Sequence, residues 1–427
     1  MLNPAQSKDR RTPILVIGHA VIATGFSRVL HSLLGHLSAN YEVHHFAPNY
    51  HGPAPHCDWT IHPNPSPMDL YGGAHLQRLM EQVKPGLVLV LADLWVIPRY
   101  LEVLRIHRAH TKVIAYCPVD GRILDPGGLA WLPEVSKLVV YTKFAKQEIE
   151  GAMAALAAQR PGFHAPEIAV IPHGTSTDLF YPYPDRDINQ SPEARREDAR
   201  RKLFLDGNLK KDSFIVLNAS RNQPRKRIDL TLEGFALFAQ NKPDTVRLYL
   251  HMGMKEIGWN IRALAREFGI ADRLLTTTDG PSHPSVSERQ LNLIYNACDV
   301  GINTAGGEGW GLACFEHAAT GAAQIVPRHS GCAELWTGAA IMLEPVKTQP
   351  MGRFLEASIV SAEGVAAALE SLYRDPSFRH TMSRAAYANA TQPRCHWENI
   401  ARAWDELFNQ ALAGCWRNNK SWSCSSA

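Results

Sequence analysis

The sequence predicts an α/β protein with two doubly wound parallel sheets that face each other across a cleft. The chain has 427 residues, which is enough for two domains. Short apolar runs alternate with stretches of helical spacing, a pattern typical of parallel strands joined by helices. A polar stretch interrupts the alternation after Phe180, and the alternation restarts after Asp212. This interruption divides the chain into two halves.

The first half contains six predicted strands. Most are short runs rich in Val, Ile and Leu, as expected of strands that are buried on both faces. These strands are Pro13–Gly18, Glu42–Ala47, Leu87–Leu91, Val113–Tyr116, Leu138–Tyr141 and Ile168–Ile171. A loop through Thr24–Ser27 follows the first strand, and apolar residues from Val29 to Leu37 then recur at helical spacing.

The second half repeats the alternation. Its predicted strands are Ser213–Ala219, Val246–Met252, Leu274–Thr277, Val300–Asn303, Gln324–Pro327 and Ala340–Leu343. Its predicted helices are Leu230–Gln240, Trp259–Phe268, Ser287–Ala297, Gly311–Thr320, Ala362–Arg374, Phe378–Ala390 and His396–Ala413. The polar stretch between the halves mixes charges of both signs, which predicts a solvated linker with one surface helix.

Composition narrows the class of protein. An apolar content of 45% and a charged content of 20% are ordinary for a soluble globular protein. A net charge of +3 gives no support for binding to nucleic acid. The eight cysteines form no CxxC pair, and no secretory leader follows Met1, so we expect reduced thiols in a cytoplasmic protein. The longest apolar run, Gly86 to Pro98, is too short to span a bilayer.

The most informative segment is the glycine-rich run from Gly306 to Glu316, which follows an apolar strand and leads into a predicted helix. Such a turn holds phosphate, because its glycines let the backbone approach and the helix start offers free N–H groups. Two carboxylates, Glu308 and Glu316, would repel phosphate, so we expect them to face hydroxyl groups. Phosphate beside hydroxyl groups is the chemistry of a nucleotide-sugar.

Two cations follow the first strand of the second half. Arg221 and Lys226 are separated by four residues in a loop that contains Pro224. Because the carboxyl ends of parallel strands meet at one edge of a sheet, both cations are expected opposite the glycine-rich turn. There they would neutralise a diphosphate.

These motifs together resemble those of the retaining glycosyltransferases of family 4, whose architecture of two Rossmann-like domains is called GT-B. The Glu-x7-Glu motif of that family matches Glu308 and Glu316, and its Arg-x4-Lys pair matches Arg221 and Lys226. Two further matches are the domain junction Ile171–Pro182 and the pair Tyr295 and Asp299. The resemblance covers about Ile14 to Leu412 and is clearest between residues 171 and 335.

The chain departs from the family pattern at several positions. His173 and Ser176 replace the usual Asn and Asp of the junction, and Trp310 replaces the usual Phe. Thr304 and Ala305 replace Pro and Ser. None of these changes removes a phosphate or sugar ligand.

The resemblance implies a role for each matched residue. Arg221 and Lys226 would bind the donor diphosphate and stabilise the charge on the leaving group. Glu316 would hold the ribose hydroxyls, and Glu308 those of the transferred sugar. The implied donor-binding residues are Gly25, Arg221, Lys226, Glu308, Gly309, Trp310, Gly311, Leu312 and Glu316. The implied catalytic residues are Arg221, Lys226, Glu308 and Asp120, which would lie under the sugar.

The resemblance also implies a domain layout. Residues 1–182 would form an acceptor-binding domain and residues 183–395 a donor-binding domain. A C-terminal helix at 396–417 would pack back on the first domain, and a disordered tail would follow at 418–427. The donor would be a UDP- or GDP-sugar acting as co-substrate, with no other cofactor and no metal. The acceptor would carry a hydroxyl group, and membrane association is not predicted.

Other interpretations of single residues remain open. Arg225 and Arg227 fit a solvated basic patch, and Asp93 fits either the acceptor side of the cleft or, slightly better, a helix cap. His19 fits a cleft-lining or a structural role equally well. The predicted function is a cytoplasmic retaining hexosyltransferase. The alternatives are a catalytically silent GT-B scaffold, or a disaccharide synthase or phosphorylase on the same fold.

Overall fold

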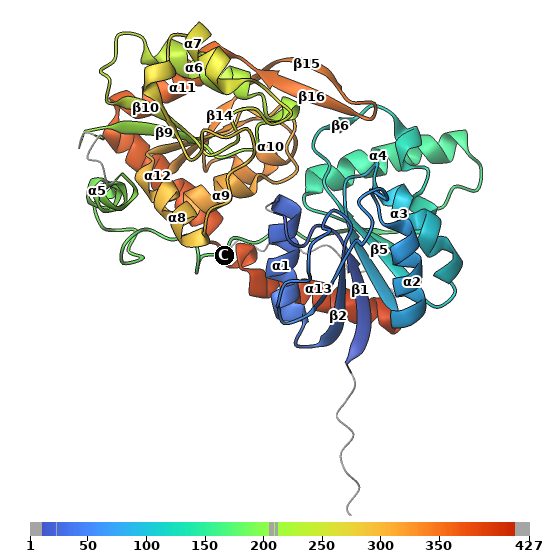
Figure 1. The fold of residues 1–427 in the computed structure, drawn as a ribbon. Helices are drawn as coiled ribbons and strands as arrows, with labels where there is room; N and C mark the ends of the chain where they lie inside the picture. Colours follow the sequence, from blue (N-terminus) through green and yellow to red (C-terminus); the bar gives the residue numbers. More distant parts are fainter. Residues whose placement is uncertain (1–10, 23, 205–208, 210–211, 415–427) are drawn as a thin grey trace, which may run out of the picture.

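The computed structural model describes residues 11–22, 24–204, 209 and 212–414. Figure 1 shows two domains, each built on a parallel sheet with helices on its faces. The predicted tail at 418–427 and the end of the predicted last helix at 415–417 lie outside the described residues.

The first sheet has seven parallel strands in the order β3-β2-β1-β4-β5-β7-β8. Their bounds are β1 (Thr12–Ile17), β2 (Tyr41–Ala47), β3 (Thr60–Pro63), β4 (Leu87–Leu91), β5 (Lys112–Cys117), β7 (Lys137–Val140) and β8 (Ile168–Val170). The helices of this domain are α1 (Gly25–Leu37), α2 (Gly73–Val83), α3 (Ile97–Leu104) and α4 (Lys143–Gln159).

The second sheet has six parallel strands in the order β11-β10-β9-β12-β13-β14. Their bounds are β9 (Phe214–Asn218), β10 (Val246–Leu250), β11 (Leu274–Thr276), β12 (Val300–Ile302), β13 (Ala323–Pro327) and β14 (Ile341–Leu343). The helices that follow the first domain are α5 (Pro192–Leu203), α6 (Ile228–Ala239), α7 (Ile261–Glu267), α8 (Glu288–Ala297), α9 (Leu312–Ala319), α10 (Ser330–Trp336), α11 (Ala362–Arg374), α12 (Pro376–Ala390) and α13 (Trp397–Leu412).

The predicted fold class is confirmed, and each predicted strand lies within about two residues of an observed one. The apolar runs signalled these strands because both faces of each central strand are buried, as in β4, which is buried throughout. Strand β3 and helix α10 are too short and too polar to give such a signal. Helix α1 begins earlier than predicted, since Thr24 caps it by accepting a hydrogen bond from the Ser27 amide at 3.2 Å.

A third, antiparallel sheet joins the two domains and was not predicted. It contains the hairpin β15 (Pro345–Met351) and β16 (Leu355–Val360), and β16 pairs with β6 (Arg122–Ile123) of the first domain. Figure 1 shows this hairpin reaching from the second domain to β6. Strand β15 is largely exposed and contains two prolines, so it lacks the apolar pattern of a core strand.

Part of helix α5 is more buried than its charged sequence predicts. Arg195 and Arg196 are buried, with relative exposures of 3% and 6%. Arg195 donates to the Thr320 carbonyl at 3.1 Å, and Arg196 lies 3.1 Å from Asp299. Two charges of this surface helix therefore satisfy carbonyl and carboxylate groups of the second domain, which the sequence did not predict.

Helix α13 crosses back onto the first domain, where it packs against α1 (Figure 1). Trp404 is fully buried, and its ring centroid lies 4.8 Å from that of Tyr116 on β5. At the far end of the helix, Tyr41 of β2 donates to the Asn409 side chain at 3.2 Å. The last helix of the chain thus completes the core of the first domain.

Replacing Trp404 by Ala is expected to lower the free energy of unfolding by about 3–5 kcal/mol, because it opens a large cavity between the helix and β5. Urea denaturation followed by circular dichroism measures this loss. Arg402→Ala is the matched control on the same helix, since its side chain is 59% exposed. A loss below about 1 kcal/mol for Trp404→Ala would contradict the packing described here.

Candidate active site

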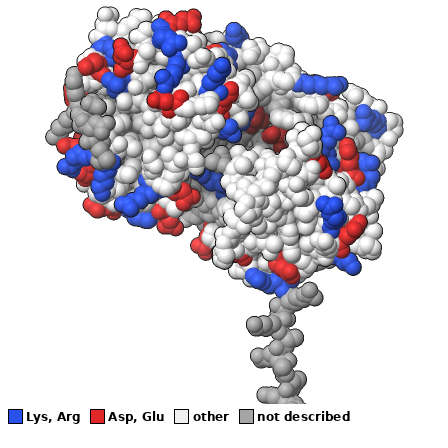
Figure 2. Space-filling model, in the orientation of Figure 1, with Lys and Arg blue, Asp and Glu red and all other residues white. Residues whose placement is uncertain are grey.

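A cleft of about 1040 Å³ lies between the two domains. Figure 2 shows it as a hollow with acidic and basic side chains inside. Its walls are the loops that follow the carboxyl ends of β1, β4 and β5 on one side and of β9, β10 and β12 on the other. Ligands of doubly wound sheets bind at this edge.

The glycine-rich turn occupies the centre of the cleft. It runs from the end of β12 to Gly311, whose φ of 88° favours glycine and which directly precedes α9. The Gly306 amide donates to the Arg225 carbonyl at 2.8 Å, and Thr304 donates to the Arg227 carbonyl at 2.8 Å. The turn and the Arg-x4-Lys loop are therefore fixed against each other.

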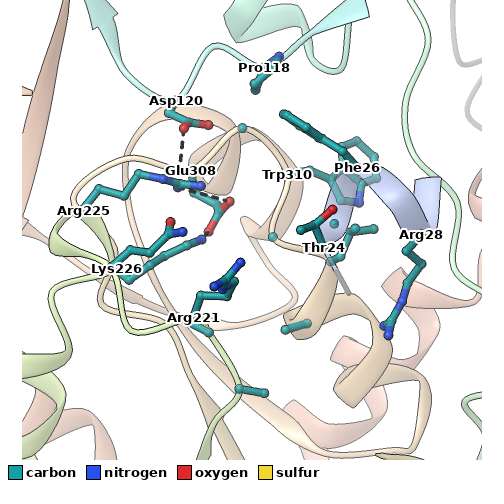
Figure 3. Close-up of a pocket in the computed structure, with 18 of the residues that line it drawn as sticks. Thr24, Phe26, Arg28, Pro118, Asp120, Arg221, Arg225, Lys226, Glu308 and Trp310 are labelled. Carbon is teal, nitrogen blue, oxygen red and sulfur yellow. Dashed lines mark hydrogen bonds and ion pairs between the residues drawn. The ribbon is translucent and has the colours of Figure 1, made fainter. Parts of the chain in front are cut away.

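Glu308 is buried in this turn, with a relative exposure of 7%. Its carboxylate forms an ion pair with Lys226, and Arg225 lies 3.9 Å away (Figure 3). Burial raises the pKa of Glu308, but the two cations outweigh that effect, so the net pKa lies below its ordinary value. The structure thus holds Glu308 as a carboxylate beside one of the predicted diphosphate ligands.

Asp120 reaches the same place from the first domain. Its carboxylate lies 3.4 Å from Arg225, which also donates to the Gly307 carbonyl at 3.0 Å (Figure 3). Burial raises the pKa of Asp120, although Arg225 opposes this shift. The interpretation of Arg225 as part of a solvated patch is wrong, because its guanidinium enters the cleft. Arg227 pairs with Asp229 at 2.6 Å.

Arg221 lines the cleft opposite the start of α9 and is held by Glu256, a residue that the sequence analysis missed. Arg221 Nη2 lies 2.8 Å from the Glu256 carboxylate, whose side chain is only 4% exposed. Burial raises the pKa of Glu256, but hydrogen bonds from His283, the Gly253 amide and Arg221 lower it to about 2. Glu256 therefore stays ionised and orients Arg221.

Glu316 lies on α9 and is 3% exposed. Tyr295 of α8 donates to its Oε2 at 2.9 Å, and Arg28 of α1 forms an ion pair with its Oε1. The attraction of Glu316 raises the pKa of Arg28 above its ordinary value. Arg28 was also missed, although it lies one helical turn after the predicted Gly25. It links the first domain to the predicted ribose ligand.

The other predicted donor residues also line the cleft. Gly25 begins α1, and a Cβ atom at this position would lie 3.4 Å from Leu312, so the two domains nearly touch here. Gly309 faces the first domain as well, since its amide hydrogen-bonds to Asp120. The structure therefore brings together all the predicted residues: Gly25, Asp120, Arg221, Lys226, Glu308, Gly309, Trp310, Gly311, Leu312 and Glu316.

Comparison with known proteins places the fold. The family model described as glycosyl transferases group 1 matches residues 199–389, just under half of the chain. Sucrose-phosphate synthase from Thermosynechococcus elongatus superposes with a TM-score of 0.68 at 19% identity, covering 95% of this chain and 100% of that one. A complex of Anabaena HepE with UDP-glucose gives 0.67 at 14% identity, covering 94% and 100%. The fold is GT-B.

Two curated relatives match over only part of their length. Mannosylfructose-phosphate synthase of Agrobacterium fabrum is 25% identical over 171 residues, which are 40% of this chain and 34% of the relative. D-inositol 3-phosphate glycosyltransferase of Streptomyces griseus is 26% identical over 260 residues, which are 58% and 49%. The matched part of the chain thus spans between a third and a half of these relatives. Part of the chain is thus similar to glycosyltransferases, and the whole chain has their fold.

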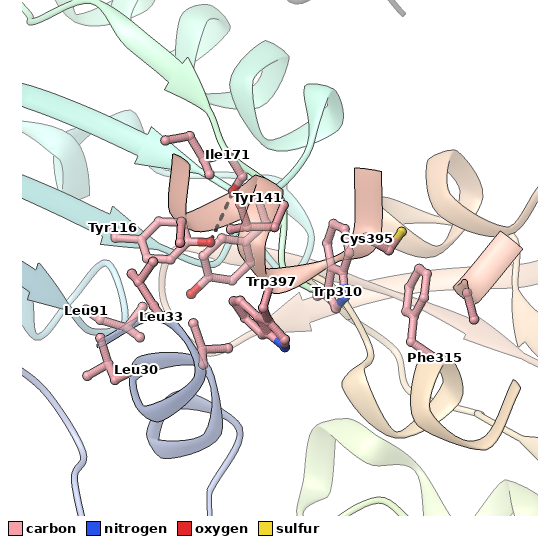
Figure 4. Close-up of a cluster of buried hydrophobic side chains, with 14 of the residues drawn as sticks. Leu30, Leu33, Leu91, Tyr116, Tyr141, Ile171, Trp310, Phe315, Cys395 and Trp397 are labelled. Carbon is pink, nitrogen blue, oxygen red and sulfur yellow. Dashed lines mark hydrogen bonds between the residues drawn. The ribbon is translucent and has the colours of Figure 1, made fainter. Parts of the chain in front are cut away.

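The side chain of Trp310 lies in a cluster of buried hydrophobic side chains at the domain junction (Figure 4). Its ring stacks on Phe315 at 5.0 Å and lies 5.4 Å from the ring of His173. His173 is buried, which lowers its pKa to about 3, and its Nδ1 is hydrogen-bonded to the Tyr116 hydroxyl at 2.8 Å. Trp310 therefore offers its backbone to the cleft and its side chain to the core.

Two residues that the sequence left open line the first-domain side of the GT-B cleft. Asp93 does not cap α3, whose N-cap residue is Val96, so the interpretation as a cap is wrong. Burial, with a smaller contribution from Asp120, raises the pKa of Asp93 to about 6. His19 also lines the cleft, with its Nδ1 2.9 Å from Thr24 Oγ1. Burial lowers its pKa to about 4.

Within 11–22, 24–204, 209 and 212–414, no three His, Cys, Asp or Glu side chains are grouped as a metal site would require. The helices in these ranges are either too short or too polar to cross a lipid bilayer.

The raised pKa of Asp93 predicts a pH-dependent stability. Between the unfolded pKa of 3.8 and the folded value of about 6, the folded state binds more protons, so its stability falls as the pH rises. Asp93→Asn removes this effect. The variant should gain about 1 kcal/mol over the unmodified protein when the pH is raised from about 5 to about 7.5.

Urea denaturation at the two pH values measures this difference. Asp272→Asn is the matched control, because Asp272 is exposed. If the two variants respond to pH in the same way, Asp93 is not a buried carboxyl group.

Proposed function

We propose that this protein is a cytoplasmic retaining glycosyltransferase that moves a hexose from a nucleoside-diphosphate-sugar to an acceptor hydroxyl group. The donor would be a UDP- or GDP-sugar. The leaving diphosphate would be stabilised by Arg221 and Lys226 without a metal ion.

One observation carries this proposal: two cations, two carboxylates and a helix start converge in one cleft. Lys226 of the Arg-x4-Lys loop contacts Glu308 in the glycine-rich turn, and Glu316 lies in α9, the helix that follows this turn. A diphosphate suits the cations and the free amides of the helix start. The carboxylates suit hydroxyl groups, with the sugar at Glu308 and the ribose at Glu316.

These ion pairs leave room for a nucleotide-sugar to bind in the cleft. Each oxygen of Glu316 has one protein partner, Arg28 on Oε1 and Tyr295 on Oε2. A carboxylate has about four acceptor sites, so sites remain for ribose hydroxyls. Arg221 is held by Glu256 through Nε and Nη2, so Nη1 would be the nitrogen that donates to a phosphate. Such fixed donors stabilise charge that develops on a leaving group.

The comparisons support the donor part of the proposal. HepE was determined in complex with UDP and glucose and with UDP-glucose, and it shares the fold. The first domain would hold the acceptor, and Asp120 would lie beneath the sugar that is transferred. Five of the six free thiols in the described residues are buried, which suits a reducing compartment.

A synthase of a disaccharide phosphate is a second candidate, favoured by the names of two relatives. Its acceptor would bring a phosphate to the first-domain wall of the cleft. Among the described residues of that wall, Arg28 is the single Lys or Arg side chain, and Glu316 already pairs with it. Transfer assays with matched neutral and phosphorylated sugar acceptors separate the two candidates.

A catalytically silent scaffold is the remaining alternative, and it gives no reason for Arg221, Lys226, Glu308 and Glu316 to converge. Lys226→Ala is expected to lower turnover of a nucleotide-sugar about 10²–10³-fold, because one preorganised charge is lost at the leaving group. Glu316→Ala is expected to weaken nucleotide binding. Lys146→Ala on α4 is the control outside the cleft. Unchanged turnover and binding in both cleft variants would contradict the catalytic proposal.

Nucleotide preference is expected to appear as a thermal shift. A ligand at about 100 times its Kd stabilises a folded protein by about 2.7 kcal/mol. We expect UDP or GDP to raise the melting temperature more than the corresponding monophosphate, because the second phosphate reaches Arg221 and Lys226. The shift should disappear in the Lys226→Ala variant. An equal shift with the monophosphate would place the cations outside the nucleotide site.

A further inference from the structure

The hairpin β15–β16 belongs to the second domain in sequence, but its strand β16 pairs with β6 of the first domain. In its register Leu355 lies opposite Ile123 and Glu356 opposite Arg122. The Leu124 amide donates to the Phe354 carbonyl at 2.8 Å, which extends the pairing to the turn of the hairpin. The cleft is thus bridged by backbone hydrogen bonds as well as by side-chain charges.

Two glycines of the first domain make this bridge possible. A Cβ atom on Gly121 would lie 2.2 Å from the Glu356 carbonyl oxygen. A Cβ atom on Gly128 would lie 2.5 Å from the ring of Phe354. Any side chain at Gly121 would force the two strands apart, because the obstacle is backbone.

The same hairpin also enters the candidate active site. The Ser358 amide donates to the Gly306 carbonyl at 2.8 Å, which joins β16 to the start of the glycine-rich turn. At the end of β15, Met351 lines the cleft. Its Cε would be 2.7 Å from a Cβ atom on Gly307 and 3.6 Å from one on Gly121. Met351 therefore lies between the turn that carries Glu308 and the loop that carries Asp120.

We propose that Met351 forms a wall of the transferred-sugar pocket and limits the size of the sugar, and that pairing between β6 and β16 holds it there. This inference rests on the proposed function. A thioether side chain gives shape without strong hydrogen bonds, so it selects by volume, whereas Glu308 and Asp120 select by hydrogen bonding. Because its position depends on both domains, the wall is complete only when the domains are closed as in this structure.

The test compares the binding of two donors that differ by an N-acetyl group. Dissociation constants of glucose and N-acetylglucosamine donors, each as its UDP and GDP derivative, are measured by titration calorimetry. Met351→Ala should change the ratio of the two constants about tenfold in favour of the N-acetyl sugar, since it removes most of the wall. Met351→Leu conserves the volume and should keep the ratio of the unmodified protein.

A second pair of variants tests whether the pairing between β6 and β16 holds Met351 in place. Gly121→Ala should move the ratio in the same direction as Met351→Ala although Met351 is intact. It should also speed hydrogen exchange at residues 122–124 and 355–360. Gly151→Ala on α4 is the matched control, because a Cβ atom there would meet nothing within 4 Å.

The outcomes separate the two proposals. If the unmodified protein binds none of these donors, this inference is overturned, and the thermal shifts with UDP and GDP decide whether the proposed function stands. If it binds them and Met351→Ala leaves the ratio unchanged, only the inference about Met351 is overturned. A third outcome concerns the pairing between β6 and β16. If Met351→Ala changes the ratio of dissociation constants, while Gly121→Ala changes neither this ratio nor hydrogen exchange at residues 355–360, the position of Met351 does not depend on that pairing.

Discussion

The buried carboxylate of Glu308 is the constraint on which the rest of the site depends. A charge with 7% relative exposure is stable only beside compensating charge and hydrogen bonds. Lys226 and Arg225 supply that charge, and both come from a loop some 80 residues earlier in the chain. Arg225 in turn draws in Asp120 from the other domain. The ion pairs that compensate the charge of Glu308 therefore hold the glycine-rich turn, the Arg-x4-Lys loop and the first domain together.

The two domains are joined by several contacts of different kinds, and most of them surround the cleft. Arg28 reaches Glu316, and β6 pairs with β16. On the outer side, the carboxylate of Glu334 accepts hydrogen bonds from the Lys143 and Phe144 amides at the start of α4. Because the polar contacts involve cleft residues or their neighbours, domain closure and ligand binding draw on the same groups.

The sequence predicted the parts of this molecule that follow from local pattern. Buried parallel strands and the Glu-x7-Glu and Arg-x4-Lys motifs were visible because period and spacing mark them. Glu256 and Met351 were not visible, since their roles depend on contacts with Arg221 and Gly307 that arise only in the folded chain. Asp93 was misinterpreted for the same reason: a strand-end carboxylate fits a helix cap until α3 is seen to begin at Ile97.

The charges in the cleft also determine how a diphosphate would enter it. Lys226 is already paired with Glu308, and Arg221 with Glu256. A diphosphate must therefore share these cations with carboxylates that cannot leave, and Glu308 would then be left with less compensating charge. Hydroxyl groups of a sugar can supply the missing hydrogen bonds to Glu308, because a carboxylate accepts from neutral donors as well. A diphosphate alone cannot do this. Under the proposed function, the site would therefore suit a sugar joined to a diphosphate better than either group separately.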